Sequence, residues 1–342
     1  MMRSLKQTLR NNQLVAFFLL NFLLTWFFFF LPSVLGITDK LIVLLLSAIG
    51  GSGPAIAAIM LSALLQPDKT GTRSKTRWLV FSSAAIITIL LVVTYLNISI
   101  TDASVLLLLL IAVNAGIAAY IVSGGFSHTA GIRGLLDKLY QYRVSLAWYG
   151  VAFMVPLAIY LCSGLAGAIY AHDSLSLLLP RISLSSLFWL VVSFGYIGLI
   201  RGPMREEVGW RGFALPRLQE HFSPLVATLI LSVIWTFWHL PLYLNGMYPG
   251  GISGILDRCY WNIGLTFLFT WIYNHTKGSL LLVTLFHTTI NTCGTLIAFP
   301  DSISGPFSLA FIILVNTAAI VVIIADRMWI GLAKQAAKAH SR

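Results

Sequence analysis

The chain has 342 residues, of which 58% are hydrophobic and only 10% are charged. A soluble domain carries about 25% charged residues, so this composition excludes a water-soluble fold and indicates a protein that uses the lipid bilayer as its solvent. The net charge of +11 does not indicate a nucleic-acid-binding protein, because the basic residues lie in short groups between long apolar runs.

Ten runs without a charged residue follow one another along the chain, and each is long enough to cross a bilayer as a helix. A charge near the bilayer centre costs at least about 2.5 kcal/mol, so charged residues mark the ends of the spans. None of the runs shows the alternation of a barrel strand. We therefore predict an all-α polytopic transmembrane helical bundle of about ten spans, at residues 11–38, 41–67, 78–101, 103–132, 144–172, 182–200, 221–256, 259–276, 278–300 and 302–325.

The distribution of lysine and arginine predicts the orientation of these spans. If the N-terminus is cytoplasmic, 19 of the 22 Lys and Arg residues lie in cytoplasmic segments and 3 in outer segments. This bias follows the positive-inside rule. We therefore expect an integral protein of a bacterial plasma membrane with both termini in the cytoplasm. The first apolar run is expected to remain as a span, because it is too long for a signal peptide and no small-residue cleavage site follows it.

Three parts are predicted along the chain. Residues 1–181 would form about five accessory transmembrane helices, and residues 182–300 would form the functional core, since they hold every motif described next. Residues 301–342 would form the last transmembrane helix and a basic cytoplasmic tail. The three cysteines show no spacing typical of metal ligands and are expected to be small core residues.

The first motif holds two of the three glutamates of the chain, Glu206 and Glu207, in the segment MREEVGWRGF. On a helix, Glu207 and Arg211 lie four residues apart and can pair on one face, while Glu206 points about 100° away. This spacing predicts that Arg211 pairs with the Glu207 carboxylate and that the Glu206 carboxylate is available for catalysis. The alternative is a solvated cytoplasmic cluster whose arginines only set the topology: Arg201, Arg205, Arg211 and Arg217.

Two further motifs lie inside apolar runs. Trp235 and His239 are four residues apart, as are His287 and Asn291, so each pair shares one helix face. Ionisable groups within spans usually face a cavity or the bundle interior, which favours a functional role for both histidines. His275 lies near a span end and is expected to be a structural hydrogen-bond partner.

Taken in order, the three motifs resemble those of the CAAX prenyl protease and bacteriocin-processing (CPBP) family, the Abi-type intramembrane protease group that includes the Ras-converting prenyl endopeptidase. The resemblance covers residues from about 182 to 300. The family more often has phenylalanine at the aromatic position of the second motif. The matching residues are Glu206, Glu207, Arg211, Trp235, His239, His287 and Asn291.

The resemblance implies an intramembrane endopeptidase and a role for each residue. Glu206 and His239 would activate a water molecule, and His287 and Asn291 would stabilise the oxyanion of the tetrahedral intermediate. The arginine of the first motif would hold the second glutamate, which shapes the site, and the aromatic residue would support it. The expected partners are membrane lipid and a peptide or lipidated protein substrate, CAAX-like or carrying a leader peptide.

Three alternatives accompany this interpretation. Two histidines and one glutamate with an open position also make a catalytic zinc set, here Glu206, His239 and His287, although no HExxH motif is present. Our hypothesis is catalysis without a cofactor, with Zn²⁺ as the alternative. The other two are a proton-coupled small-molecule transporter, which the lack of internal repeats argues against, and a non-catalytic membrane immunity or scaffold protein.

Overall fold

Helices make up 82% of the chain in the part that the structure describes. The computed structural model describes residues 2–69, 71, 74–172, 183–296 and 301–331. Within these ranges there is no β-strand, and one isolated bridge joins Lys69 to Thr129. The predicted all-α helical fold is therefore confirmed.

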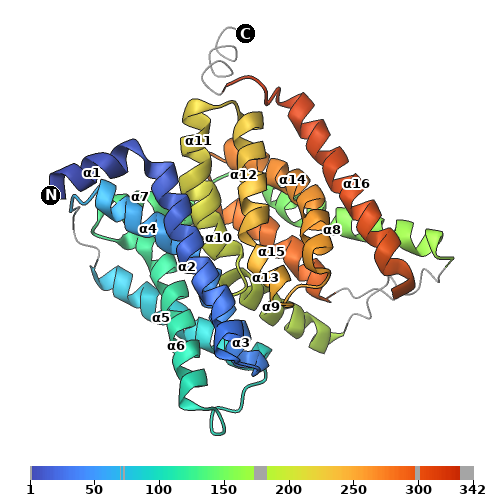
Figure 1. Cartoon of the computed structure of the whole chain (residues 1–342), viewed down its shortest axis with the longest axis horizontal. Helices are drawn as coiled ribbons and strands as arrows, with labels where there is room; N and C mark the ends of the chain where they lie inside the picture. Colours follow the sequence, from blue (N-terminus) through green and yellow to red (C-terminus); the bar gives the residue numbers. More distant parts are fainter. Residues whose placement is uncertain (1, 70, 72–73, 173–182, 297–300, 332–342) are drawn as a thin grey trace. The chain divides into compact units, whose positions relative to one another are not determined.

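The helices follow the order of the predicted apolar runs. η1 and η2 are short 3-10 helices, and η4 is a single π-helical stretch. The bounds of the elements labelled in Figure 1, and of the short ones between them, are α1 (Met2–Asn11), α2 (Gln13–Leu35), α3 (Lys40–Gly50), α4 (Gly53–Leu65), α5 (Ser74–Tyr95), α6 (Val105–Ser123), η1 (Gly124–Phe126), α7 (Ala130–Leu136), η2 (Asp137–Tyr140), α8 (Leu146–Tyr170), α9 (Leu184–Leu199), α10 (Pro203–Gly209), η4 (Trp210–Ala214), α11 (Leu215–His221), α12 (Pro224–Trp238), α13 (Leu240–Leu244), α14 (Gly251–His275), α15 (Leu280–Leu296) and α16 (Asp301–Ala325).

Each of the ten predicted runs overlaps at least one of these helices, and the run at 221–256 is divided between α12, α13 and the start of α14. Eight stretches of the described chain are long and apolar enough to cross a membrane: Gln13–Leu35, Lys40–Leu65, Ser74–Tyr95, Val105–Phe126, Leu146–Tyr170, Leu184–His221, Pro224–Leu244 and Gly305–Ala325. The run predicted at 278–300 contains α15, whereas α14 begins at Gly251, eight residues before the run predicted at 259–276, because Asp257 and Arg258 lie within the helix rather than between two spans. α15 is an apolar helix of only 17 residues, and α14 carries Asp257 and Arg258. The number of ten spans stays a prediction.

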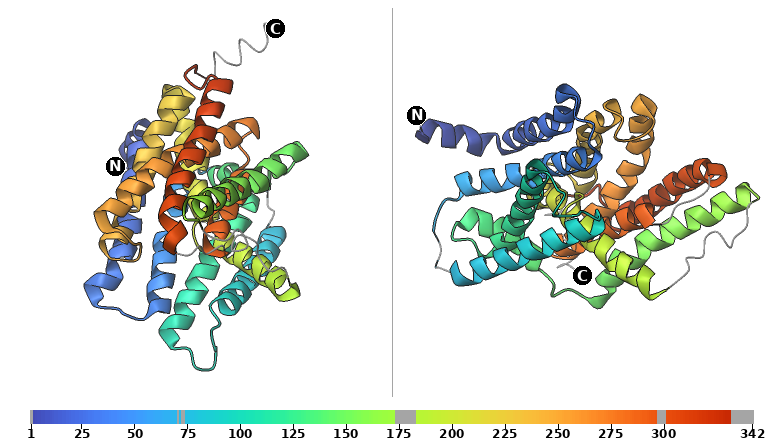
Figure 2. Two further views of the ribbon diagram at one scale, coloured as in Figure 1. Left: turned by 90° about the vertical axis from the view of Figure 1, so that its right-hand side faces the viewer. Right: turned by 90° about the horizontal axis from the view of Figure 1, so that it is seen from below.

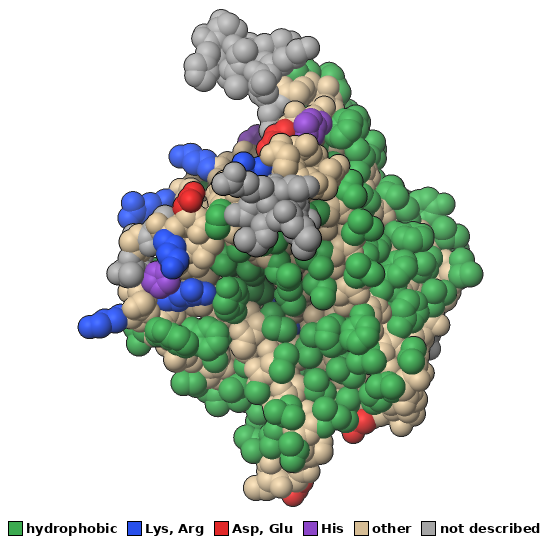
Figure 3. Space-filling view, turned by 60° about the vertical axis from the view of Figure 1, so that its left-hand side comes forward, with side chains coloured by type: hydrophobic (Ala, Val, Ile, Leu, Met, Phe, Trp, Pro, Cys, Tyr) green, Lys and Arg blue, Asp and Glu red, His purple; other side chains and the backbone are tan. Residues whose placement is uncertain are grey.

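Large apolar side chains lie exposed on several of these helices. Leu23 is 70% exposed on α2, Trp78 is 68% exposed on α5, and Leu184 is 86% exposed on α9. Figure 3 shows apolar side chains over a broad part of one face. Soluble monomers rarely expose apolar patches larger than a few hundred Å², whereas lipid tails solvate such surfaces. The exposed side chains therefore fit an integral membrane protein, the class to which the span lengths also point.

The chain forms two compact units. The first comprises Met1–Arg143, Gly195–Ala214 and Gly278–Thr284, and the second comprises Val144–Phe194, Leu215–Lys277 and Leu285–Arg342. The predicted division into residues 1–181, 182–300 and 301–342 stays a prediction. Its boundaries border residues 173–182 and 297–300, which lie outside the described residues, as do residues 332–342 of the predicted basic tail.

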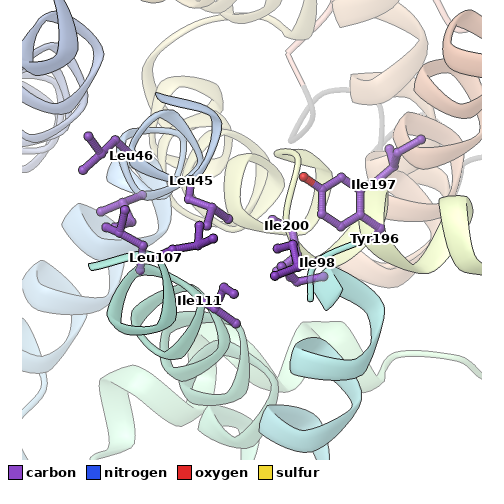
Figure 4. Packing of buried hydrophobic residues seen from close by; sticks show 11 residues of the cluster. Leu45, Leu46, Ile98, Leu107, Ile111, Tyr196, Ile197 and Ile200 are labelled. Atoms are coloured by element: carbon purple, nitrogen blue, oxygen red, sulfur yellow. The ribbon is translucent and has the colours of Figure 1, made fainter. Parts of the chain in front are cut away.

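In the first unit, α2 packs on α3 and α4, and α5 runs beside α6 (Figure 1). A buried apolar cluster joins α3, α6 and the end of α9, and Figure 4 shows its side chains: Leu45, Leu46, Ile98, Leu107, Ile111, Tyr196, Ile197 and Ile200. The Tyr196 ring also stacks on the Tyr95 ring, with 4.1 Å between the centroids. Packing at this cluster therefore anchors the end of α9, from which the chain continues into α10.

Small residues let both α10 and α2 approach the start of α4. A Cβ added at Gly209 would lie 2.5 Å from the Cβ of Pro54, and one added at Gly53 would lie 2.1 Å from the Thr25 hydroxyl oxygen. Atoms do not pack that closely, so glycine is required at both positions. Close backbone approach at small residues is a common way for membrane helices to associate. It positions α10, which carries the acidic motif.

In the second unit, α16 lies alongside α8, as Figure 2 shows, and α14 packs against both α12 and α16. Polar side chains join α12 to α14: Thr228 donates to the Thr270 hydroxyl at 3.0 Å, and Asn262 Nδ2 donates to the Thr236 hydroxyl at 2.9 Å. Such hydrogen bonds contribute about 0.6 kcal/mol each between membrane helices. The α12 and α14 pair holds the second motif in place.

Candidate active site

The acidic motif lies on α10 and is buried in the first unit. Glu206 is 6% exposed, and Glu207 and Arg211 are fully buried. Arg211 NH1 lies 3.1 Å from Glu207 Oε1, so the pair predicted from the four-residue spacing forms. The alternative of a solvated charge cluster is wrong for these side chains, because charge pairs on a solvated helix face do not bury both partners completely.

The backbone around the motif departs from a regular α-helix at both ends. Pro203 occupies the first helical position of α10, where its missing N–H removes no hydrogen bond, and Gly202 precedes it with φ of +127°. At the other end, α10 continues into the π-helical stretch Trp210–Ala214, which contains Arg211. Single π-helical turns inside α-helices occur frequently at functional sites.

Gly202 lies directly against the Glu206 carboxylate. A Cβ added at Gly202 would lie 2.2 Å from Glu206 Oε1, and its φ of +127° is strained for any L-residue with a side chain. We expect Gly202→Ala to displace the carboxylate and to lower the free energy of unfolding by about 1–3 kcal/mol. Thermal unfolding of the purified protein in detergent measures this. Gly116→Ala is the matched control, since a Cβ there meets nothing within 4 Å; equal midpoints for the two variants would contradict the prediction.

Arg205 is a functional candidate that the sequence analysis placed only among the topology-setting arginines. It is fully buried, and its guanidinium donates to oxygens of three other segments. Nε donates to the Leu199 carbonyl, NH1 to the Ala48 carbonyl, the Ser52 hydroxyl and the Asn114 side-chain oxygen, and NH2 to the Asn114 carbonyl, at 2.8 to 2.9 Å. Uncharged oxygen atoms therefore surround the guanidinium of Arg205, the residue that precedes Glu206.

Asn114 was the signal in the sequence that could have revealed this arginine. It lies in the middle of the apolar run that forms α6, and a polar side chain in a span usually has a partner. Its Nδ2 donates to the carbonyls of Leu45 and Leu110, which orients its oxygen toward Arg205. Spacing alone could not have named the partner, because 91 residues separate the two.

In the second unit, His239 lies at the junction of α12 and α13. Pro241 has no N–H to donate to the Phe237 carbonyl four residues earlier, so the helix is interrupted here: α12 ends at Trp238 and His239 becomes its C-cap. The His239 ring is 3% exposed, and its Nδ1 lies 2.8 Å from the Trp235 carbonyl oxygen. The predicted Trp235 and His239 face therefore exists, with a backbone hydrogen bond that the spacing did not predict.

The Trp235 ring contacts both histidines of the predicted site. Its centroid lies 5.7 Å from that of His239 and 5.6 Å from that of His287, and the His287 ring also lies 5.1 Å from Phe269. His287 is 4% exposed on α15, with Asn291 partly exposed one turn later. The structure thus brings His239 and His287 to one aromatic cluster around Trp235, whose supporting role stays a prediction.

Arg258 is a second residue that the sequence analysis did not single out. It lies on α14, and its NH2 is 2.7 Å from His239 Nε2. The guanidinium lies over the rings of Tyr248 and Trp261, at 5.5 and 4.7 Å from their centroids. The available signal was weak: a single arginine in a predicted outer segment, three residues before a tryptophan.

His275 occupies the structural role expected of it. Its Nδ1 lies 3.0 Å from the Trp271 carbonyl and 3.4 Å from Asp326 Oδ2, and its ring packs near Trp148. The His275 side chain is 41% exposed, whereas His239 is buried.

The zinc alternative does not fit the second unit as it stands. His239 Nδ1 lies against a carbonyl oxygen, as in many metal-binding histidines, but the Arg258 guanidinium occupies Nε2, the nitrogen that would bind the ion, and its positive charge repels a second cation there. Within the described ranges, no group of three or more His, Cys, Asp and Glu side chains has a geometry that could hold an ion. We derive no step through zinc.

The six predicted catalytic residues are divided between the units. The acidic motif, with Glu206, Glu207 and Arg211, belongs to the first, and the histidine motifs, with His239, His287 and Asn291, belong to the second. Each half has the local geometry described above. Their convergence on one pocket stays a prediction.

These features define a class: a polytopic helical membrane protein with ionisable side chains buried among its helices. Comparison with known proteins is more specific. Residues 186–293 match the family described as type II CAAX prenyl endopeptidase Rce1-like, and every predicted catalytic residue lies in this range. The resemblance inferred from the three motifs is therefore confirmed over that segment.

One curated relative supports the same assignment. Over 103 residues the chain is 32% identical to CAAX prenyl protease 2 of Methanococcus maripaludis. The alignment covers 27% of this chain and 36% of the relative, so the chain spans about a third of that protein's length in the match. The similarity thus concerns the motif-bearing segment.

Proposed function

We propose that this protein is an intramembrane endopeptidase that hydrolyses a peptide bond of a membrane-associated substrate. The observation that carries the proposal is the match of residues 186–293 to the CAAX prenyl endopeptidase family, in the segment that holds all three motifs. The burial of the acidic motif supports it, because a carboxylate shielded from bulk water suits a general base. The substrate class proposed is a CAAX-like or leader-bearing peptide or lipidated protein.

Glu206 is the proposed general base. It takes a proton from water as the water oxygen attacks the carbonyl carbon of the scissile bond, and it returns that proton to the leaving amine nitrogen. Glu207 is unsuited to this task, since its charge is held by the Arg211 guanidinium at 3.1 Å. The proposed role of that pair is to shape the acidic half of the site.

His239 is proposed to accept a hydrogen bond from the attacking water, and His287 and Asn291 are proposed to donate to the developing oxyanion. Such donors act most strongly where water is excluded, as it is around the nearly buried His287 ring. We propose that the reaction needs no metal ion. Loss of activity of the purified protein in a chelator, with recovery on addition of zinc, would overturn this part of the proposal.

Glu206→Gln is expected to lower the rate of hydrolysis by about 10²- to 10⁴-fold, because glutamine keeps the shape of the side chain and removes the base. The test compares membrane peptides of cells that carry the wild type or the variant, and then measures cleavage of the precursor that accumulates. Glu220→Gln is the control, since Glu220 is the remaining glutamate and is exposed. Identical peptide profiles for wild type and Glu206→Gln would argue for a non-catalytic protein, and proton-coupled uptake lost in the variant would favour a transporter.

A further inference from the structure

The imidazole of His239 is held between two groups of opposite hydrogen-bonding character. The Trp235 carbonyl oxygen lies 2.8 Å from Nδ1 and can only accept. Arg258 NH2 lies 2.7 Å from Nε2 and can only donate. Nδ1 must therefore carry the hydrogen, and Nε2 must present its lone pair. Both contacts select the same neutral tautomer.

We propose that Arg258 is a positioning residue, which keeps His239 in the Nδ1–H tautomer with Nε2 as a hydrogen-bond acceptor. Its guanidinium has a fixed charge and no acceptor atom, so it cannot hydrogen-bond to the other tautomer. It also disfavours the imidazolium, whose Nε2–H would point at another N–H donor 2.7 Å away. The contact thus excludes two of the three forms of the ring.

The surroundings of Arg258 hold the guanidinium at this position. The Tyr248 and Trp261 rings flank it, and a guanidinium over an aromatic face is attracted by the electrons of the ring. Tyr248 is itself fixed, since its N–H donates to the Leu242 carbonyl at 2.8 Å, and its ring is nearly parallel to that of His239. Within the described ranges no carboxylate pairs with Arg258, so His239 is its hydrogen-bond acceptor rather than a competitor for an acidic partner.

The catalytic consequence of this tautomer rests on the proposed function, in which His239 acts on the attacking water. In this tautomer His239 can only accept at Nε2, so a water molecule that it orients toward the base takes the place of the Arg258 N–H, and the ring cannot donate to an oxyanion. The donors must then be found elsewhere, as proposed for His287 and Asn291. Arg258 would therefore decide which of the two histidines accepts and which donates.

The first test measures the tautomer and needs no substrate. The full chain is labelled with ¹⁵N-histidine, and the His239 signals are identified by their loss in His239→Gln. We expect a protonated Nδ1 and an unprotonated, hydrogen-bonded Nε2 in the wild type and in Arg258→Lys, and a mixture of tautomers in Arg258→Met. A proton on Nε2 of the wild type would overturn the proposal, even if Arg258→Met does not fold.

The second test measures hydrolysis. Arg258→Met is expected to lower kcat by about 10- to 100-fold with little change in KM, and Arg258→Lys to recover part of the loss, as for residues that orient a reactive imidazole. Arg201→Met, at an exposed arginine, is the control. Unchanged kcat and an unchanged tautomer in Arg258→Met would refute the role. A tautomer shift in a protein without any peptidase activity would instead support the positioning and refute the proposed function, so the two failures are distinguishable.

Discussion

Arg211→Met is expected to lower the free energy of unfolding by about 3–5 kcal/mol, the cost typical of removing one partner of a buried ion pair. Both side chains are fully buried, and Arg211 NH1 lies 3.1 Å from Glu207 Oε1. The variant would leave the Glu207 carboxylate in the same low-dielectric surroundings after the loss of its cation. Unfolding of the purified protein by denaturing detergent gives the difference.

A double-mutant cycle tests whether the pair is the cause. Glu207→Gln with Arg211→Met removes both charges, so the double variant should be more stable than the sum of the two single losses predicts, by at least about 0.5 kcal/mol. Arg201→Met provides the exposed control and should stay within about 0.5 kcal/mol of the wild type. Additive losses in the cycle would show that the two side chains stabilise the fold independently.

Arg205→Met is expected to lower the free energy of unfolding by about 3 kcal/mol or more. The guanidinium donates five hydrogen bonds to oxygens of Leu199, Ala48, Ser52 and Asn114, and each buried acceptor that loses its donor costs about 1–3 kcal/mol. Relief of the buried positive charge offsets part of this loss, but several acceptors are affected at once. Thermal and denaturant unfolding of the variant measure the balance.

The partner Asn114 supplies the control for Arg205. Asn114→Leu removes one acceptor, and the Arg205→Met and Asn114→Leu double variant should lose less stability than the two single variants combined. Arg205→Lys keeps the charge but not the planar fork of donors, so an intermediate loss is expected. Wild-type stability of Arg205→Met would mean that neighbouring donors or water replace the guanidinium without cost.

Parts of the candidate site could be predicted because they are local. The Glu207 and Arg211 pair lies within one helical stretch, so the four-residue spacing sufficed, and the same spacing placed Trp235 next to His239. Arg205 could not be predicted in this way, since its acceptors at Ala48 and Asn114 are 157 and 91 residues distant. The contact of Arg258 with His239 depends on the turn after α13, whose geometry no helical periodicity describes.

The sequence by itself determined that this is an all-α membrane protein, which apolar stretches form its helices, and which side chains can pair along one helix. Composition and periodicity are sufficient for these predictions, because the bilayer interior excludes backbone polar groups without hydrogen bonds and charged side chains without partners. Only the tertiary structure decided that Arg205 and Arg211 are buried rather than solvated, and that Arg258 lies against His239 Nε2. Burial and hydrogen-bond partners depend on which helices meet in space. The separation of two helices along the chain does not show whether they meet.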